Sequence, residues 1–437
     1  MKINKMNSGS AQSLWIHIST SLWFLPSTIV LFSIALALGL MELDMRFGKE
    51  LSQAYPRFFS HEPDGANTML GTIASSMATI VGVVFSIVIV ALVLASTQYT
   101  SRILRNFMSD PITQTMLGTL TGIFTYSLLI LRGMSSDQDS FVPALSVLGG
   151  FLLALIGIAL FIMFIHHIAS SIQASSIVAE ITKETIQSIK DTYPMQCHPP
   201  EELDQLSGLK DVSGFERYPI QANKTGYIQS AKPEGLVKFA VEHGVIIQMK
   251  CCVGNFVDAK TELVLVYSQK PVTEDMITHV QDFFAIDSFR TVIQDPSYGI
   301  RQLVDIALKA LSPGINDTTT AVTCIEHLAV ILSSCANRCI PAPNRYQDEQ
   351  LRLISCGPDF RSMVELAFIQ ILESAKGSSE IYINLLTALH KISKCVETGD
   401  HMQAIKHLQG MIQEDIGLHV RNQSIRARIE TATPTLL

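Results

Sequence analysis

Charged side chains are scarce in this chain of 437 residues. Asp, Glu, Lys and Arg make up 16% of it, whereas about 25% is usual in a soluble globular protein. Apolar residues reach 48%, and the mean hydropathy is +0.30. This composition excludes an intrinsically disordered chain and a small disulfide-rich secreted module. We therefore expect a membrane protein that has the lipid bilayer as a partner.

A positive net charge and the common catalytic motifs are also lacking. The net charge is −7 at pH 7, and nucleic-acid binding depends on neutralising phosphates with Lys and Arg, so we expect no nucleic-acid partner. The sequence contains no phosphate loop, dinucleotide fingerprint or nucleophile elbow. No catalytic constellation is visible, so we expect no enzyme, no catalytic residue and no cofactor.

Long stretches of the chain contain no charge at all: Leu22–Met41, Gly65–Ser101, Pro111–Leu131 and Ser140–Ala179. A helix needs about 20 apolar residues to cross the hydrocarbon core of a bilayer. Four stretches of sufficient length predict a transmembrane domain over residues 1–170. Its helices are expected at about 22–41, 70–97, 112–131 and 143–167.

The orientation of these spans follows from the distribution of basic residues. Four spans place both termini on one side, and more Lys and Arg flank that side than the other, which favours a cytoplasmic location for both termini. All eight cysteines lie between Cys197 and Cys395, and their spacing does not suggest a disulfide framework. Free thiols suit a reducing compartment, so the cysteines also favour a cytoplasmic C-terminal part.

Small residues recur at spacings of three and four in the second span. They are Gly71, Ser75, Ala78, Thr79, Gly82 and Ser86. Small side chains allow helices to approach closely in lipid, so one interpretation is tight packing within the four-helix bundle. The alternative is that this helix lines a pore in an oligomer.

Polar and basic residues follow the second span at its expected cytoplasmic mouth. They are Gln98, Tyr99, Arg102 and Arg105. The arginines are candidates for binding lipid phosphate or for attracting anions to a pore. The alternative interpretation is a simple anchor at the membrane interface.

The C-terminal part is expected to be a cytoplasmic α+β domain. Residues 171–214 read as a helical extension and a linker rich in Pro and Gly, and residues 215–272 as a small β-rich module. The pattern from Val253 to Val266 resembles part of a biotinyl/lipoyl-type barrel, and we expect a structural barrel there. Residues 273–420 read as a helical module and residues 421–437 as a frayed or disordered tail. Neighbouring Cys and His residues lack zinc-ligand spacing, so we expect no metal site.

A long motif between Gln294 and Ala321 carries a family resemblance. Asp295-Pro296-Ser297-Tyr298-Gly299 leads into a helix, and Ser312-Pro313-Gly314-Ile315-Asn316-Asp317 follows it. Together with Ser96–Tyr99 and Arg102–Phe107, this motif resembles a bacterial membrane-protein family filed as domain of unknown function 2254. The resemblance implies a multi-pass protein of the bacterial inner membrane with a cytoplasmic domain, and it supplies no activity.

The same motif contains candidates for binding a small ion or anion. They are Arg301, Asp305, Ser312, Asn316 and Asp317. Backbone amides at a helix N-terminus favour anions, so these residues are able to form a ligand site. The alternative is a joint between two helices, in which the same residue types cap the helix ends. The expected caps are Asp295 for the first helix and Asn316 or Asp317 for the second.

Two functions are consistent with these patterns. The first is an oligomeric pore or transport-like protein, a homo-oligomer whose second span lines the path and whose cytoplasmic domain assembles or gates it. The second is a membrane-anchored sensor or scaffold whose C-terminal domain binds a small anion or a partner protein.

Overall fold

The computed structural model describes residues 23–54, 63–98, 110–134, 143–171, 173–195, 214–340, 344–347, 350–375 and 377–432. The chain divides into two compact units, Met1–Gln173 and Ala174–Leu437, which are called the N-terminal and C-terminal units below.

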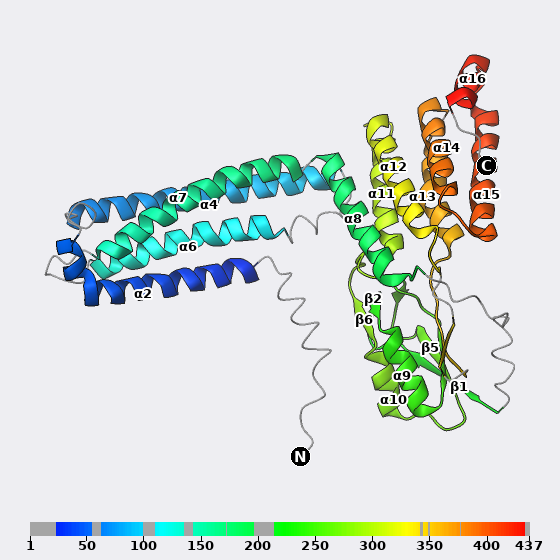
Figure 1. The fold of residues 1–437 in the computed structure, drawn as a ribbon, viewed down its shortest axis with the longest axis horizontal. Coiled ribbons are helices and arrows are strands. Elements are labelled where there is room, and N and C mark those ends of the chain that lie inside the picture. Colours follow the sequence, from blue (N-terminus) through cyan, green and yellow to red (C-terminus); the bar gives the residue numbers. More distant parts are fainter. Residues whose placement is uncertain are drawn as a thin grey trace. The chain divides into compact units, whose positions relative to one another are not determined.

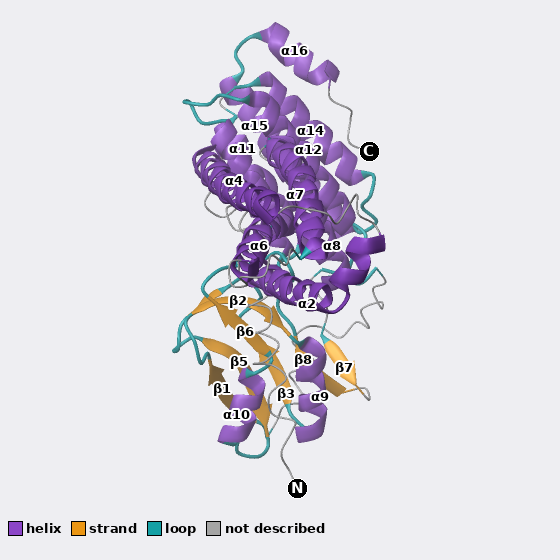
Figure 2. Cartoon of the chain, turned by 90° about the vertical axis from the view of Figure 1, so that its left-hand side faces the viewer, coloured by secondary structure: helices purple, strands orange, loops and turns teal. Residues whose placement is uncertain are grey.

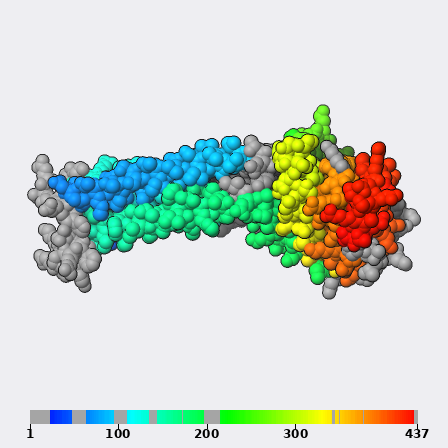
Figure 3. All heavy atoms as spheres, turned by 90° about the horizontal axis from the view of Figure 1, so that it is seen from above, coloured from blue at the N-terminus to red at the C-terminus, as the bar shows by residue number. Residues whose placement is uncertain are grey.

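The N-terminal unit is helical where it is described, as expected. Its helices overlap the four apolar stretches and are α2 (Phe24–Ala54), α4 (Pro63–Gln98), α6 (Pro111–Met134) and α7 (Ala144–Ser171). Helix α6 packs against all three others and has the largest share of buried residues of the four (Figure 1). Helices α4 and α7 form adjacent rows of side chains (Figure 3).

Glycines allow the close helix contacts within this unit. A Cβ atom added to Gly118 of α6 would lie 2.8 Å from the Cα of Pro26 in α2. One added to Gly157 of α7 would lie 2.8 Å from Ile123 Cδ1 of α6. Helices in lipid are held mainly by such close packing, so these glycines mark points of close contact in the bundle.

Five described helices are long and apolar enough to cross a membrane, by length and composition. Four belong to the N-terminal unit, and the fifth is α12 (Thr318–Cys335) of the C-terminal unit. Helix α12 packs against four other helices of its own unit, and its side chains Ile325, Leu328 and Leu332 are fully buried there. The expectation of four spans therefore stays a prediction.

The helical part of the C-terminal unit begins with α8 (Ala174–Thr192). Its apolar stripe, which includes Ile177, Ile181 and Ile189, is buried against α11 and α12. The remaining helices are α11 (Pro296–Ala310), α13 (Phe360–Ser374), α14 (Ser379–Ser393), α15 (Gly399–His419) and α16 (Gln423–Ala432). Helix α16 lies in the range that we expected to be a tail, and its Ile429 is buried.

The expected barrel is wrong, because the strands form two separate open sheets. One sheet has the order β1-β5-β3-β8-β7, and the other has the order β4-β2-β6. The strands are β1 (Glu216–Gln221), β2 (Gly226–Ala231), β3 (Ile246–Met249), β4 (Phe256–Val257), β5 (Glu262–Ser268), β6 (Phe284–Asp287), β7 (Arg345–Gln347) and β8 (Gln350–Ile354). Helices α9 (Pro233–His243) and α10 (Glu274–Gln281) lie against the five-stranded sheet (Figure 2).

Closure of the sheet is prevented by strands that come from far along the chain. Strand β8 pairs in parallel with β3 and continues the sheet to β7, so β3 is not an edge strand, and the sheet ends at β1 and β7, which do not pair with each other. Strands β6, β7 and β8 also lie in the range that we expected to be helical. Each contains only three to five residues, which is too short for a clear alternating pattern.

The expectation of free cysteines is wrong for three of the described cysteines and confirmed for the other four. Cys252 and Cys356 form a disulfide bond that joins residues 104 positions apart, with their Cα atoms at 5.4 Å. Cys339 is likewise disulfide-bonded, while Cys251, Cys324, Cys335 and Cys395 are free. The cysteines therefore no longer favour a reducing compartment, and the expectation that this unit is cytoplasmic depends on the basic residues alone.

Candidate functional site

The small residues of the second span do not pack inside the N-terminal unit. Gly82, Ala78 and Ser86 are exposed on α4, and a Cβ atom added to Gly82 or Gly71 would meet no atom within 4 Å. The buried face of the same helix consists of larger side chains, among them Leu70, Met77 and Val84. These residues therefore make no close helix contact within the described part of the unit, and whether they pack against another helix or line a pore stays a prediction.

The exposed residues extend further along α4 than the sequence suggested. Small residues stand at alternating steps of three and four and are all exposed, a row that we call the α4 seam. It consists of Gly65, Thr68, Thr72, Ser75, Thr79, Gly82 and Ser86. Steps of three and four average 3.5 residues. Residues that recur at this interval stay on the side of a helix that faces a partner helix when the two wind into a left-handed coiled coil. Counting at this repeat would have found Thr68 and Thr72 in the sequence.

The hydroxyl groups of the seam donate to carbonyls of their own helix. Thr72 Oγ1 donates to the Thr68 carbonyl at 2.7 Å, Thr79 Oγ1 to Ser75 at 2.9 Å, and Ser86 Oγ to Gly82 at 3.0 Å. These bonds satisfy the hydroxyl protons without a partner from another helix. Each oxygen then still presents an acceptor lone pair outward, so the seam is polar but carries no charge.

The residues expected at the mouth after α4 are only partly described. Gln98 is the last residue of α4, and its side chain lies outside the described residues. Tyr99, Arg102 and Arg105 also lie outside the described residues. Their role stays a prediction.

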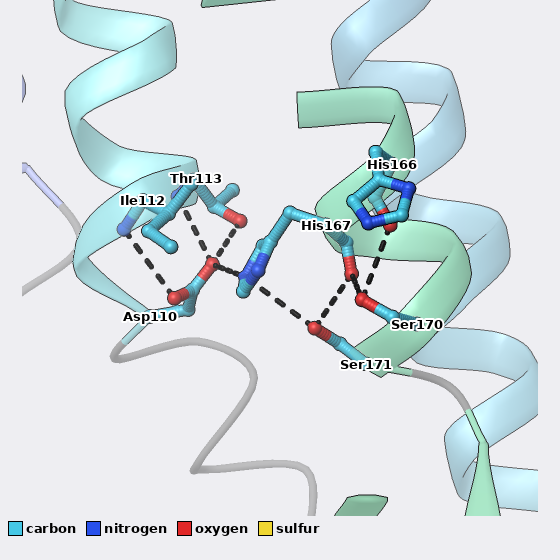
Figure 4. Close-up of polar contacts among 7 residues, drawn as sticks. All are labelled: Asp110, Ile112, Thr113, His166, His167, Ser170 and Ser171. Atoms are coloured by element: carbon cyan, nitrogen blue, oxygen red, sulfur yellow. Dashed lines mark hydrogen bonds and ion pairs between the residues drawn. The ribbon is translucent and has the colours of Figure 1, made fainter. Parts of the chain in front are cut away.

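A polar cluster lies where α6 begins and α7 ends (Figure 4). Asp110 is the N-cap of α6 and accepts hydrogen bonds from the backbone N–H and the hydroxyl of Thr113 at 3.0 and 2.5 Å. His167 Nε2 of α7 lies 3.1 Å from the same carboxylate oxygen, and Ser171 Oγ lies 3.4 Å from that nitrogen. These contacts therefore connect the start of α6 to the end of α7.

The opposite end of the unit contains a buried carboxylate. Asp44 of α2 is 1% exposed and accepts hydrogen bonds from the backbone N–H groups of Leu145 and Ser146, at 2.9 and 2.8 Å, and from the Ser146 hydroxyl at 2.7 Å. Tyr126 donates to the Ser146 carbonyl at 2.7 Å. Asp44 therefore caps α7 from another helix, at a distance in sequence that no local pattern reveals.

In the C-terminal unit, the motif at Asp295 contains an ion pair that the sequence did not reveal. Arg290 Nε and Nη2 donate to Asp295 Oδ2 at 2.9 and 2.7 Å, and the guanidinium lies over the Tyr298 ring. Asp295 Oδ1 accepts from Tyr298 N at 3.1 Å, which confirms the expected N-cap of α11. Burial raises the pKa of Asp295, and the Arg290 charge opposes that rise.

The candidate ligand residues downstream make contacts within and between helices. Arg301 forms an ion pair with Asp305 at 2.8 Å and donates to Gln370 of α13 at 2.6 Å. Asp317 caps α12, as expected, because its Oδ1 accepts from Thr320 N at 3.0 Å.

Ser312 and Asn316 shape the joint between α11 and α12. The Ser312 hydroxyl donates to the Lys309 carbonyl at 2.7 Å, and Asn316 adopts a left-handed backbone with φ of 50°. These are the contacts of a capped joint, and binding of an ion or anion by these residues stays a prediction.

Replacing Asp317 separates its capping from a charge-dependent role. We expect Asp317→Asn to be nearly neutral, because Asn caps equally well, and Asp317→Ala to cost about 0.5–2 kcal/mol of unfolding free energy. A hydrogen bond from Thr320 lowers the pKa of Asp317, so its contribution is complete above the unfolded pKa and is lost as the pH falls through the folded pKa. Urea titrations of the three proteins at neutral and acidic pH measure both effects. If the Asn variant is stable but has lost transport or ligand binding, the charge of Asp317 belongs to a ligand site.

The described residues contain no cluster of three or more His, Cys, Asp or Glu side chains that would hold a metal ion. Burial raises the pKa of the Cys324 and Cys335 thiols to about 12, so they stay protonated at neutral pH. His327 Nδ1 lies 2.8 Å from Thr182 Oγ1 of α8.

Comparison with known proteins gives a family and no activity. The model of a family described as "Predicted membrane protein (DUF2254)" matches residues 19–391. Uncharacterized proteins from two strains of Mycobacterium tuberculosis and from Mycobacterium bovis are each 27% identical over 397 residues, which cover 87% of this chain and 73% of theirs. No solved structure matches the chain.

Proposed function

The chain belongs to the family of predicted membrane proteins filed as domain of unknown function 2254, and from this premise we propose that it is an oligomeric pore or transport-like protein of the bacterial inner membrane. The α4 seam lines the path, and the C-terminal unit assembles or gates it. The observation that carries this proposal is the exposure of the whole seam on the bundle surface.

The small, polar surface of the seam is less suited to contact with lipid chains than to contact with a second helix or with water. Exposed side chains elsewhere on α4 are large and apolar, for example Phe85, Ile89 and Val90. The seam instead offers small side chains and outward oxygen lone pairs, which solvate water or a permeating solute without a fixed charge. Copies of α4 that meet at a repeat of 3.5 residues pack with a small left-handed crossing angle.

In this arrangement α2, α4, α6 and α7 cross the membrane, and α12 does not. The apolar face of α12 that contains Ile325, Leu328 and Leu332 is already covered by helices of its own unit, so this face does not need lipid to cover it. Both termini then lie on one side, and the distribution of Lys and Arg favours the cytoplasm for that side.

Gly82→Leu tests the pore. The change replaces a residue that has no side chain by a large one on the seam, which would obstruct the path. We expect the conductance of the purified full chain in planar bilayers to fall at least roughly tenfold, as it does when a constriction is blocked. Val83→Leu is the matched control, because Val83 is the next residue, is 44% exposed, and points about 100° away from the seam.

The control is expected to conduct like the parent protein. A parent protein that is monomeric in mild detergent and silent in bilayers would overturn the proposal. Equal conductance of the Gly82→Leu and Val83→Leu variants would show that the α4 seam does not line the path.

The second candidate function is a membrane-anchored sensor or scaffold. It is favoured by the size of the C-terminal unit, Ala174–Leu437, which has its own buried core and two sheets and is large for a mere anchor. Its ligand would be a small anion or a partner protein. Thermal-shift screening of the full chain against inorganic and organic anions tests it, and a stabilising ligand combined with silent bilayers would favour this function over the pore.

A further inference from the structure

The Cys252–Cys356 bond joins the β-sheet part of the C-terminal unit to its helical part. Cys252 begins the Cys252–Asn255 turn between β3 and β4. Cys356 lies between β8 and α13, in the segment that leads into the helical bundle. The bond therefore connects the sheets to the entry of a bundle helix.

The Cys252–Asn255 turn lies directly on the Arg290–Asp295 ion pair. Gly254 has φ of +89°, and a Cβ atom added to it would lie 2.8 Å from Arg290 Nη2 and would also meet the Asp295 carboxylate. The turn is fixed on its other side by Gly254 N, which donates to the Ile228 carbonyl at 2.8 Å. The turn is thus in direct contact with the residue that caps α11.

The two bonded cysteines are more accessible than their neighbours. Both are partly exposed, whereas Cys251, Cys324 and Cys335 are buried. Burial also raises the pKa of the adjacent Cys251 thiol, whose sulfur donates to the Glu262 carbonyl at 3.2 Å. A protonated thiol is a poor nucleophile, so Cys251 does not exchange with the disulfide beside it.

We propose that Cys252 and Cys356 form a reversible redox site, oxidised by a peroxide and reduced by a dithiol, which controls how tightly the Cys252–Asn255 turn closes on the Arg290–Asp295 ion pair. The turn is held by the Gly254–Ile228 hydrogen bond and by the Cys252–Cys356 bond, so reduction removes one of these two constraints and leaves the other in place. This inference concerns the C-terminal unit and is independent of the proposed pore.

Both directions of the reaction balance. In oxidation, one cysteine thiolate attacks the peroxide O–O bond and becomes a sulfenic acid, and the second thiol then displaces water to form the S–S bond. Two thiols and hydrogen peroxide thus give one disulfide and two waters. In reduction, a thiolate of the dithiol attacks one sulfur, and its second thiol resolves the mixed disulfide, which yields two cysteine thiols and an oxidised dithiol.

Hydrogen exchange on the full chain in detergent, with dithiothreitol and then hydrogen peroxide, tests the proposal. Differential alkylation and mass spectrometry follow the state of each cysteine. On reduction we expect amide exchange to rise roughly tenfold or more in residues 252–257 and in the first turn of α11, and to stay unchanged in α14. Peroxide should restore the slow exchange. The matched control is Cys395→Ser, which removes a free thiol far along the chain from this pair and should respond like the parent.

The Cys252→Ser variant should show the fast exchange of residues 252–257 and of the first turn of α11 permanently, and neither reagent should change it, although the bond of Cys339 is still present. If this variant fails to fold, the reduced parent protein gives the same comparison. Three results would overturn the proposal: a bond that resists dithiothreitol until the unit unfolds, exchange that is unchanged by reduction, or thiols that peroxide does not rejoin.

Discussion

Asp295→Ala is expected to destabilise the C-terminal unit by about 3 kcal/mol, because it leaves one member of a buried ion pair without its partner. Asp295 is 5% exposed, and its carboxylate holds both the Arg290 guanidinium and the backbone N–H of Tyr298. Alanine removes the charge and the helix cap together. The value lies at the lower end of the range for such pairs because the Arg290 side chain is 28% exposed and partly regains water.

Two further variants divide this effect into its causes. Asp295→Asn keeps a capping oxygen and loses the charge, so it should cost roughly 1–3 kcal/mol, as the loss of a hydrogen bond to a charged group does. Asp359→Ala is the matched control, because Asp359 caps α13 through Ser362 N at 2.7 Å and has an exposed side chain. It should cost about 0.5–2 kcal/mol, as a lost cap does.

Pulse proteolysis in urea is the suitable measurement for these variants. Both tryptophans, Trp15 and Trp23, lie in the N-terminal unit, so their fluorescence does not report on the C-terminal unit. If Asp295→Ala is no more destabilising than Asp359→Ala, the ion pair with Arg290 contributes nothing measurable.

Asp44→Ala is expected to have the largest effect on the N-terminal unit. It leaves the backbone N–H groups of Leu145 and Ser146 without their acceptor, and Ser146 is fully buried while Leu145 is partly buried. Each unsatisfied buried donor costs about 1–3 kcal/mol, and the two together are enough to unfold a marginal bundle. We expect a strong fall in melting temperature and a low yield of folded protein in detergent.

Glu42→Ala is the matched control for this experiment. Glu42 stands two residues before Asp44 on the same helix, is 53% exposed, and pairs only with its helical neighbour Arg46 among the described residues. Exposed pairs of this kind add little to stability, so the control should melt like the parent protein. Equal melting temperatures for the Asp44→Ala and Glu42→Ala variants would show that Asp44 does not cap α7.

The features that the sequence predicted well depend on interactions between residues that are close together in the sequence. The apolar stretches predicted helices at α2, α4, α6 and α7, because the need to satisfy every backbone group in an apolar environment allows few other structures. Asp295 before Pro296, and Asp317 before α12, were predicted as caps because a cap bonds to an amide only three residues away. The motif around these caps also indicated the family.

The features that the sequence did not predict join residues that are distant in the chain. The barrel was wrong because β8 pairs with β3 across about one hundred residues, and the disulfide was missed because Cys252 and Cys356 are 104 positions apart. Asp44 was not recognised as the cap of α7 for the same reason.

The small residues of α4 show where the sequence reaches its limit. Their spacing identified a face of the helix but not whether that face points into the bundle or away from it. The larger residues on the opposite face, such as Leu70 and Met77, bury more apolar surface against α6 and α7, and this packing turns the seam outward. The sequence by itself determined the helices, their caps and the family, because these follow from local bonding and from hydropathy. Only the tertiary structure decided which faces are covered, because that choice depends on the combined packing of helices that are far apart in the sequence.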